Sequence, residues 1–148
     1  MEAIVFTGIQ ATGKSTFYRE YFYNTHIRIN LDMLKTRHRE NIIFRACIEA
    51  KQPFVIDNTN PTIETRKKYI AVAKPADFRI IGYYFRSKLT EALERNNHRT
   101  GKACIPEKGI RATQAKLQIP SLTEGFDVLY YVIPKNGSFI IKEWSHEI

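Results

Sequence analysis

Residues Gly8 to Thr16 read Gly-Ile-Gln-Ala-Thr-Gly-Lys-Ser-Thr, and this stretch decides the fold that we expect for the chain. It matches G-x-x-x-x-G-K-S/T, the pattern of a phosphate-binding loop, at every fixed position. Such a loop leaves a strand and opens a helix. Both flanks agree, because Ile4, Val5 and Phe6 precede the loop and aromatic residues follow it at helical spacing. The stretch therefore predicts binding of a nucleoside triphosphate.

The fixed positions of this loop have separate chemical tasks. Glycines at 8 and 13 let backbone N–H groups point at phosphate oxygens, where a side chain would block the approach. Lys14 brings a charge to the β- and γ-phosphates, and the Ser15 hydroxyl suits magnesium. The helix beginning near Lys14 adds the positive end of its dipole. The nucleotide-binding residues that we expect are Gly8, Thr12, Gly13, Lys14, Ser15, Thr16, Arg95 and Arg99.

Length and composition favour one folded domain over residues 1–148. The 148 residues are enough for a substantial core, and 43% hydrophobic and 12% aromatic residues suit a folded chain. The sequence has no run of about 18 apolar residues and no leader pattern at its start. We therefore expect a cytoplasmic protein with no membrane partner.

Charge and cysteine content narrow the expected ligands further. The net charge of +8 favours a polyanionic partner, although a solubilising surface is a commoner cause of such a charge. Cys47 and Cys104 lie far apart and fit reduced thiols. Together with the scattered histidines at 26, 38, 98 and 146 they form no zinc-binding pattern, so we expect no structural metal.

The chain alternates short β-branched or aromatic runs with longer amphipathic stretches, which is the pattern of βαβ units. Strands are expected at about 3–7, 26–30, 54–57, 78–85 and 128–133, followed by an edge hairpin that turns at Asn136-Gly137. Helices are expected at about 14–23, 33–50, 61–73, 89–97 and 106–117. The predicted fold class is α/β, a P-loop kinase fold with a mainly parallel central sheet flanked by helices.

Two carboxylates follow predicted strands, at the sheet edge where open α/β folds form their sites. Asp32 follows the second strand, where it can accept the proton of an attacking hydroxyl; a helix N-cap explains the same residue equally well. Asp57 ends the third strand in the position of a Walker B carboxylate, against the alternative of an Asp-Asn turn. We expect Lys14, Asp32 and Arg99 to be catalytic, and Ser15 and Asp57 to bind metal.

A basic, glycine-containing segment at about 95–105 has no core pattern and is predicted to form a lid. Arg95 and Arg99 are spaced to share one face of the helix leading into it. Their guanidinium groups can close over a triphosphate and offset charge on the transferring group. A solvated basic helix end is the alternative explanation of this pair.

A second basic cluster lies one turn past Asp32, with Lys, Arg, His and Arg at 35, 37, 38 and 39. Such a run is usually a solvated face. If Asp32 is the base, however, the cluster flanks the acceptor, and an acceptor that carries phosphates matches its charge. We expect acceptor binding by Asp32, Lys35, Arg39 and Asn58, although turn chemistry explains Asn58 equally well.

The order of these motifs resembles the 5′-hydroxyl polynucleotide kinase family, the P-loop kinase domain of bifunctional polynucleotide kinase/phosphatases. The resemblance runs from Ile4 to about Ile133. Its motifs are GIQATGKSTF at 8–17, INLD at 29–32, IDNTNP at 56–61, RNNHR at 95–99, IP at 105–106 and LTEGF at 122–126.

This resemblance implies a role for each motif residue. Lys14 and Ser15 would bind phosphate and magnesium, and Asp32 would be the general base. Arg99 would be the lid arginine on the triphosphate, and Asp57 would support the metal and the acceptor side. The implied reaction uses ATP and Mg²⁺ and transfers the γ-phosphate to the 5′-hydroxyl of a DNA or RNA end.

Two departures from the family pattern fall on the acceptor side. The family usually has arginine immediately before the base, where this chain has Leu31. Viral-type members have arginine three residues after it, where Lys35 offers a point charge without a bidentate fork. Two other functions therefore stay open: a kinase of a small hydroxyl acceptor such as a nucleoside or sugar, and a nucleotide-switched, nucleic-acid-binding ATPase. We expect no phosphatase or forkhead-associated domain within this length.

Overall fold

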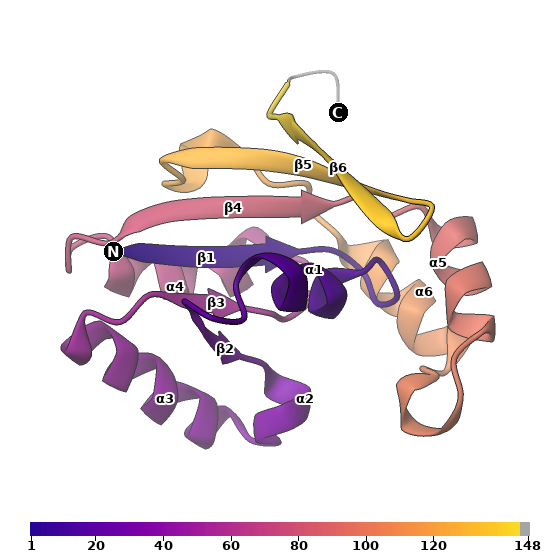
Figure 1. The fold of residues 1–148 in the computed structure, drawn as a ribbon, viewed down its shortest axis with the longest axis horizontal. Helices are drawn as coiled ribbons and strands as arrows, with labels where there is room; N and C mark the ends of the chain where they lie inside the picture. Colours follow the sequence, from indigo (N-terminus) through magenta and orange to yellow (C-terminus); the bar gives the residue numbers. More distant parts are fainter. Residues whose placement is uncertain (146–148) are drawn as a thin grey trace.

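A computed structural model describes residues 1–145, which form one six-stranded sheet with helices on both faces (Figure 1). The strands are β1 (Glu2–Thr7), β2 (Ile27–Ile29), β3 (Phe54–Ile56), β4 (Arg79–Phe85), β5 (Val128–Lys135) and β6 (Ser138–Glu143). Their order is β2-β3-β1-β4-β5-β6. Neighbouring strands from β2 to β5 pair in parallel, and β6 pairs antiparallel with β5. The predicted mainly parallel α/β fold is confirmed.

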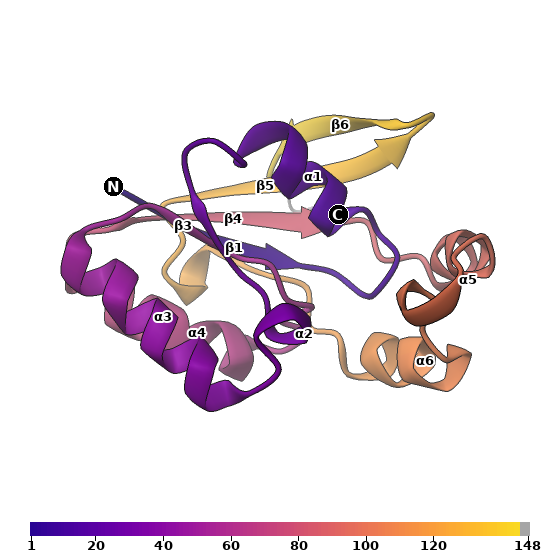
Figure 2. The same cartoon turned by 60° about the horizontal axis from the view of Figure 1, so that its bottom comes forward.

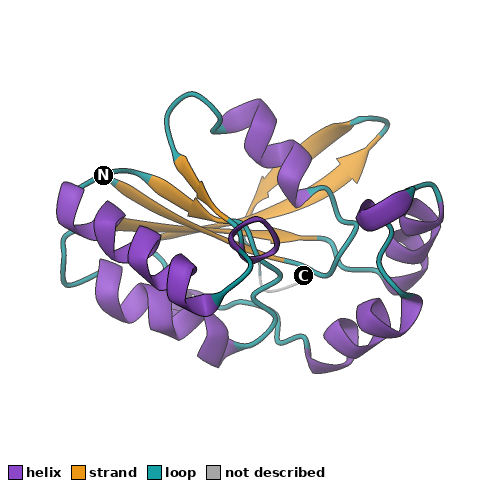
Figure 3. Ribbon diagram, turned by 90° about the horizontal axis from the view of Figure 1, so that it is seen from below, coloured by secondary structure: helices purple, strands orange, loops and turns teal. Residues whose placement is uncertain are grey.

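The helices are α1 (Lys14–Tyr21), α2 (Leu31–Leu34), α3 (Arg37–Ala50), α4 (Ile63–Ala73), α5 (Leu89–Asn97) and α6 (Glu107–Lys116). Short 3-10 helices lie at Gly101–Ala103 and Leu122–Glu124. Helix α1 covers one face of the sheet, and α3 and α4 cover the other (Figure 2). Helices α5 and α6 lie beyond the carboxyl ends of β1 and β4 (Figure 3). Within residues 1–145 no helix has the length and apolar character needed to span a bilayer.

Strand β1 is buried on both faces, which explains why its sequence is apolar at nearly every position. Ala3 and Val5 pack in the cluster that includes α3 and α4, whereas Ile4 and Phe6 face α1. The ring of Phe6 meets Phe17 of α1 edge-on, with 5.8 Å between the ring centroids. A strand covered on both sides fixes the position of the loop that follows it.

The helix predicted over 33–50 is in fact two helices. Helix α2 ends at Leu34, and Lys35 has a φ of 76°, which a continuous helix cannot accommodate. Thr36 then opens α3, because its side chain accepts a hydrogen bond from the N–H of Arg39. The apolar periodicity does not reveal this break, because the cap is a polar side-chain contact.

The N-cap suggested at Asp32 and the predicted start of the helix at 61 are also wrong. Asn30 caps α2 in place of Asp32, since the Asn30 side chain accepts the N–H of Met33. Helix α4 begins after Thr62, which forms a capping box with Thr65, and not at the predicted position 61. Several cap-type residues follow one another in both places, so sequence alone does not select the one that caps.

The predicted hairpin at Asn136-Gly137 is confirmed. Lys135 pairs with Ser138, so the loop is these two residues, with φ values of 49° and 76°. Both values lie in the left-handed region that a type I′ turn requires, and Asn-Gly adopts it at low cost.

The Leu-Thr-Glu-Gly-Phe motif at 122–126 anchors the loop before β5. The Glu124 carboxylate accepts hydrogen bonds from Arg66 at 2.8 and 3.0 Å, and Arg66 is fully buried. Gly125 has a φ of 112°, and a Cβ there would lie 2.9 Å from the Cγ2 of Ile70. This family-specific motif therefore serves packing between α4 and the sheet.

Candidate active site

The phosphate-binding loop joins β1 to α1, and both of its fixed glycines are needed where other segments approach closely. The Gly8 N–H donates to the Thr59 carbonyl at 3.0 Å, and a Cβ at position 8 would lie 3.0 Å from the Cβ of Phe85. Gly13 has a φ of 93°, and a Cβ there would lie 2.9 Å from the Phe139 ring of β6. Neither position tolerates a side chain without movement of a neighbour.

Inside the loop, the Ile9 carbonyl accepts two hydrogen bonds. One comes from the Thr12 hydroxyl at 2.8 Å and the other from the Lys14 ammonium at 2.8 Å. Ala11 has a left-handed φ of 62°, so the chain turns tightly between these groups. The Lys14 ammonium is thus held by a carbonyl of its own loop, next to the space where phosphates are expected.

Electrostatic interactions link Lys14 to the other predicted catalytic groups. Burial lowers the pKa of the Lys14 ammonium to about 8. The negative charges of Asp57 and Asp32 raise this pKa, and the positive charge of Arg99 lowers it. An incoming phosphate would raise the pKa again, because an anion stabilises the charged form of lysine.

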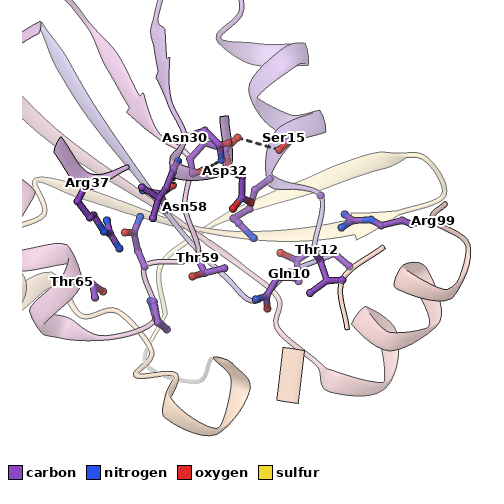
Figure 4. A pocket seen from close by; sticks show the side chains of 18 residues that line it. Gln10, Thr12, Ser15, Asn30, Asp32, Arg37, Asn58, Thr59, Thr65 and Arg99 are labelled. Atoms are coloured by element: carbon purple, nitrogen blue, oxygen red, sulfur yellow. Dashed lines mark hydrogen bonds between the residues drawn. The ribbon is translucent and has the colours of Figure 1, made fainter. Parts of the chain in front are cut away.

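These groups surround a cavity of about 290 Å³ at the carboxyl ends of the parallel strands (Figure 4). Arg37 and Arg99 reach it from opposite sides, and Asp32 lies between them. The predicted site residues that line it are Thr12, Gly13, Lys14, Ser15, Asp32, Asp57, Asn58 and Arg99. Its lining does not include Gly8, Thr16, Lys35, Arg39 or Arg95. The structure therefore brings the three predicted catalytic residues to one cavity.

A second cavity, of about 210 Å³, lies on the other side of Gly13. Thr16 and Arg95 line it together with residues 134–139 of the β5–β6 hairpin. The Arg95 guanidinium also donates to the Ala11 carbonyl at 3.5 Å. Thr16 and Arg95 thus adjoin the phosphate loop, but in a different cavity from Arg99.

The prediction that Arg95 and Arg99 share a helix face is wrong, because α5 ends at Asn97. Buried Asn96 closes the following loop: its amide donates to the Ile105 carbonyl at 2.6 Å and accepts the Ile105 N–H at 2.8 Å. Arg99 lies in this loop and donates to the Ala103 carbonyl at 3.3 Å. The contact between Asn96 and Ile105 joins residues nine apart and has no sequence signal beyond an asparagine near a helix end.

The predicted metal pair is brought together. The Ser15 hydroxyl donates to Oδ2 of Asp57 at 3.2 Å, and Asp57 is only 2% exposed. A hydroxyl and a carboxylate fit Mg²⁺, which kinase sites hold through few side chains together with phosphates and waters. Among residues 1–145 no group of three or more His, Cys, Asp or Glu could hold a metal, and His146 lies outside them.

Arg28 of β2 is a site residue that the sequence analysis missed. Its Nε donates to Oδ2 of Asp57 at 2.8 Å, and its Nη2 donates to Oγ of Ser15 at 2.9 Å. The only available signal was a cation between two isoleucines in a short predicted strand. Such a pattern does not say which partner the cation meets.

Asn58 holds the part of the cavity where the acceptor is expected. Its amide oxygen accepts the Leu31 N–H at 2.8 Å, and its amide nitrogen donates to buried Glu40 at 3.0 Å. Asn58 therefore fixes the start of α2, and with it the exposed carboxylate of Asp32. In the basic cluster, Arg37 lines the cavity, whereas Arg39 donates to the Leu34 carbonyl at 3.2 Å.

Comparison with known proteins finds a family match over most of the chain. A family model described as an AAA domain matches residues 4–120. The chain belongs to this AAA domain family. The match covers the phosphate loop, both carboxylates and the lid, so this AAA domain contains all the predicted site residues.

Several relatives and solved structures that are similar to this AAA domain are named as kinases. A bifunctional polynucleotide phosphatase/kinase of Schizosaccharomyces pombe is 34% identical over 135 residues, which cover 84% of this chain and 32% of that protein. The chain spans between 32% and 56% of the length of the curated relatives that it matches.

Two solved structures have the same fold. Kti12 of Chaetomium thermophilum, solved with ADP-AlF3, superposes with a TM-score of 0.71 at 14% identity over 88% of each chain. A gluconokinase from Sinorhizobium meliloti has a TM-score of 0.65 at 18% identity, covering 89% of this chain and 82% of its own.

Proposed function

We propose that this chain is an ATP- and Mg²⁺-dependent kinase that transfers the γ-phosphate to the 5′-hydroxyl of a DNA or RNA end. The observation that carries the proposal is the single cavity in which exposed Asp32 faces Lys14, Ser15 and Arg99. A carboxylate opposite a cationic phosphate cradle is the arrangement that transfer to a hydroxyl requires.

On the nucleotide side, the loop N–H groups, the N-terminus of α1 and Lys14 bind the phosphates of ATP. The second cavity, between Arg95 and the hairpin, adjoins this loop and offers room for the nucleobase. An arginine and the ring of Phe139 supply stacking surfaces there. Kti12, which shares the fold, was solved in complex with ADP-AlF3, and this supports nucleotide binding by the fold.

In the reaction, Asp32 accepts the proton of the acceptor hydroxyl while the oxygen of that hydroxyl forms a bond to the γ-phosphorus. The bond between the γ-phosphorus and the bridging oxygen breaks, and ADP leaves with the electron pair. Lys14 and Arg99 offset negative charge on the transferring group. Ser15 and Asp57 would hold Mg²⁺, which supplies further charge neutralisation when bound.

A polynucleotide acceptor is supported by a line of cations that leads away from Asp32. Arg37 lines the main cavity and also an adjoining groove of about 380 Å³, together with Arg45 and Lys68. The buried Glu40 carboxylate also lines this groove and pairs with Arg37 at 3.0 Å and with Lys68 at 3.6 Å, so Arg45 is its cation without a carboxylate partner among the described ion pairs. A phosphodiester chain placed in this groove would leave its 5′-hydroxyl at Asp32. Arg37 also supplies a guanidinium on the wall where the family pattern has arginine and this chain has Leu31. The polynucleotide kinase relative and the net charge of +8 agree with such an acceptor.

Replacement of Asp32, the proposed general base, separates phosphoryl transfer from ATP binding. In Asp32→Asn we expect ATP to bind with unchanged affinity, measured by calorimetry, while phosphorylation of a 5′-hydroxyl oligonucleotide is lost. Phosphorylation at the wild-type rate would show that Asp32 is not the base.

The second candidate is a kinase of a small hydroxyl acceptor. It is favoured by Leu31, which removes a charge from the acceptor wall, and by the fold shared with a gluconokinase. Acceptor binding that is insensitive to salt would support it, because counterion release accompanies only a polyanionic acceptor.

A further inference from the structure

Arg28 forms hydrogen bonds to the oxygen atoms that the proposed metal would need. Its guanidinium bonds to Oδ2 of Asp57 at 2.8 Å and to Oγ of Ser15 at 2.9 Å, and these two oxygens lie 3.2 Å apart. The Arg28 side chain is 27% exposed, whereas that of Asp57 is 2% exposed. One positive group thus covers the hydroxyl–carboxylate pair from its solvent side.

We propose that Arg28 is a built-in cation that holds the Ser15–Asp57 pair before metal binds and is displaced when Mg²⁺ arrives with nucleotide. The inference rests on the proposed function, because it takes a metal nucleotide as the ligand. It assigns to Arg28 control over how strongly nucleotide binding depends on metal.

Charge explains why the guanidinium and the metal exclude each other. A buried carboxylate is costly without a partner, and in the described structure Arg28 is the cation paired with Asp57. A divalent ion on the same oxygens would lie at contact distance from a positive guanidinium, where like charges repel strongly. Metal binding therefore requires Arg28 to move away from Asp57.

The surroundings of Arg28 allow this movement. The guanidinium carbon lies 5.9 Å from the centre of the Tyr18 ring, which offers a second contact at the same wall. Strand β2 is only three residues long and forms one edge of the sheet, so the side chain has solvent beside it. Displacement exchanges two charged hydrogen bonds for hydration, while the existing contact with the Tyr18 ring can be kept.

Two opposite consequences follow for nucleotide binding. Without metal, Arg28 neutralises Asp57 and so reduces repulsion between that carboxylate and the phosphates. With metal, the same charge opposes the ion. Arg28 therefore favours metal-free nucleotide and disfavours Mg²⁺.

The test measures ADP affinity by calorimetry in EDTA and in MgCl2, and the Mg²⁺ affinity of the ADP complex. In Arg28→Gln we expect ADP to bind about tenfold more weakly in EDTA, and Mg²⁺ to bind the ADP complex about tenfold more tightly. Arg79→Gln, which removes an equal charge from an exposed residue at the opposite end of the strands, should change neither value. Equal weakening in both conditions, or unchanged Mg²⁺ affinity, overturns the proposal.

The wild-type protein provides a second measurement that does not depend on the stability of the variant. The Nε–H resonance of Arg28 should hold its position when ADP is added in EDTA and shift when Mg²⁺ follows. A resonance that Mg²⁺ leaves unchanged in the ADP complex overturns the proposed displacement of Arg28 and leaves the proposed function standing. A wild-type protein that binds no ADP in either condition refutes the proposed function, and the inference with it.

Discussion

The two walls of the main cavity are built in different ways. The nucleotide wall lies between a doubly covered strand, β1, and helix α1, and its Ser15 hydroxyl bonds to buried Asp57. The acceptor wall is α2, a helix of four residues without a buried side chain, followed by a break at Lys35. The backbone and the core fix the first wall, whereas a few polar contacts fix the second. The acceptor wall can therefore change without loss of the fold, which suits a fold shared with a gluconokinase and Kti12.

The largest expected effect comes from the acceptor wall. Asp32→Asn should lower turnover by about 10²–10⁴-fold, because a general base contributes that much to proton transfer. ATP affinity should change little, since Asp32 belongs to α2 and not to the phosphate loop. Steady-state kinetics with a 5′-hydroxyl oligonucleotide, together with calorimetry for ATP, measure both. Asp77→Asn, at an exposed turn far from the site, is the matched control and should behave as wild type. If Asp32→Asn lost ATP affinity by as large a factor as turnover, the two walls would not act separately.

A smaller effect is expected where the two walls are joined. Asn58→Ala removes the acceptor of the Leu31 N–H and one donor to Glu40, so α2 loses its fixed position. We expect kcat/KM for the acceptor to fall by about 10²-fold, because small displacements of a positioned base are costly. The KM for ATP should change little. If the KM for ATP rises as much as acceptor efficiency falls, Asn58 supports both walls and the division is wrong.

Titration of Lys14 tests the nucleotide wall. Burial lowers the pKa of Lys14 to about 8 in the nucleotide-free protein, so the ammonium loses its proton as the pH rises past that value. ATP affinity should then fall on the order of tenfold between pH 7.5 and 9.5, since phosphate binding needs the charged form. Isothermal calorimetry across this range measures the change. Lys14→Met should bind ATP weakly at every pH, and a pH-independent wild type would contradict the role of Lys14.

The smallest effect concerns the cations beyond Asp32. Arg37→Gln should weaken binding of a 5′-hydroxyl oligonucleotide by about three- to tenfold and lower the salt dependence of that binding by about one counterion. Fluorescence anisotropy at several salt concentrations gives both quantities. Arg111→Gln, on exposed α6, is a control of equal charge. Unchanged salt dependence in Arg37→Gln would remove the groove from the acceptor path.

The difference between the nucleotide wall and the acceptor wall also explains which features the sequence could predict. Lys14 and Ser15 belong to a local motif, and Asp57 follows a fully apolar strand, so their positions follow from spacing alone. Asp32 lines the cavity, as predicted. The N-cap role suggested for Asp32 and the continuous helix predicted after it are wrong, because Asn30 and Thr36 are the N-caps of two separate helices there.

Side-chain contacts outside any periodic pattern escaped the prediction altogether. The bonds of Arg28 to Ser15 and Asp57 and the closure of the lid loop by Asn96 join residues whose pairing has no periodic signal. The specific motif at 122–126, which supports the family resemblance, acts through the buried pair of Arg66 and Glu124, and Arg66 also donates at 2.9 Å to the carbonyl of Asn60, which lines the main cavity. A motif can therefore carry a family resemblance while its own residues lie outside the site and support a residue that lines it.

The central claim, transfer of the γ-phosphate to a nucleic acid 5′-hydroxyl, is tested most directly with γ-labelled ATP. The wild-type protein, with Mg²⁺, is given a 5′-hydroxyl oligonucleotide, a nucleoside and gluconate in one mixture, and the labelled products are separated. We predict that the label appears at the 5′ end of the oligonucleotide and that Asp32→Asn transfers none. Label found only in a small compound or in free phosphate would contradict the account.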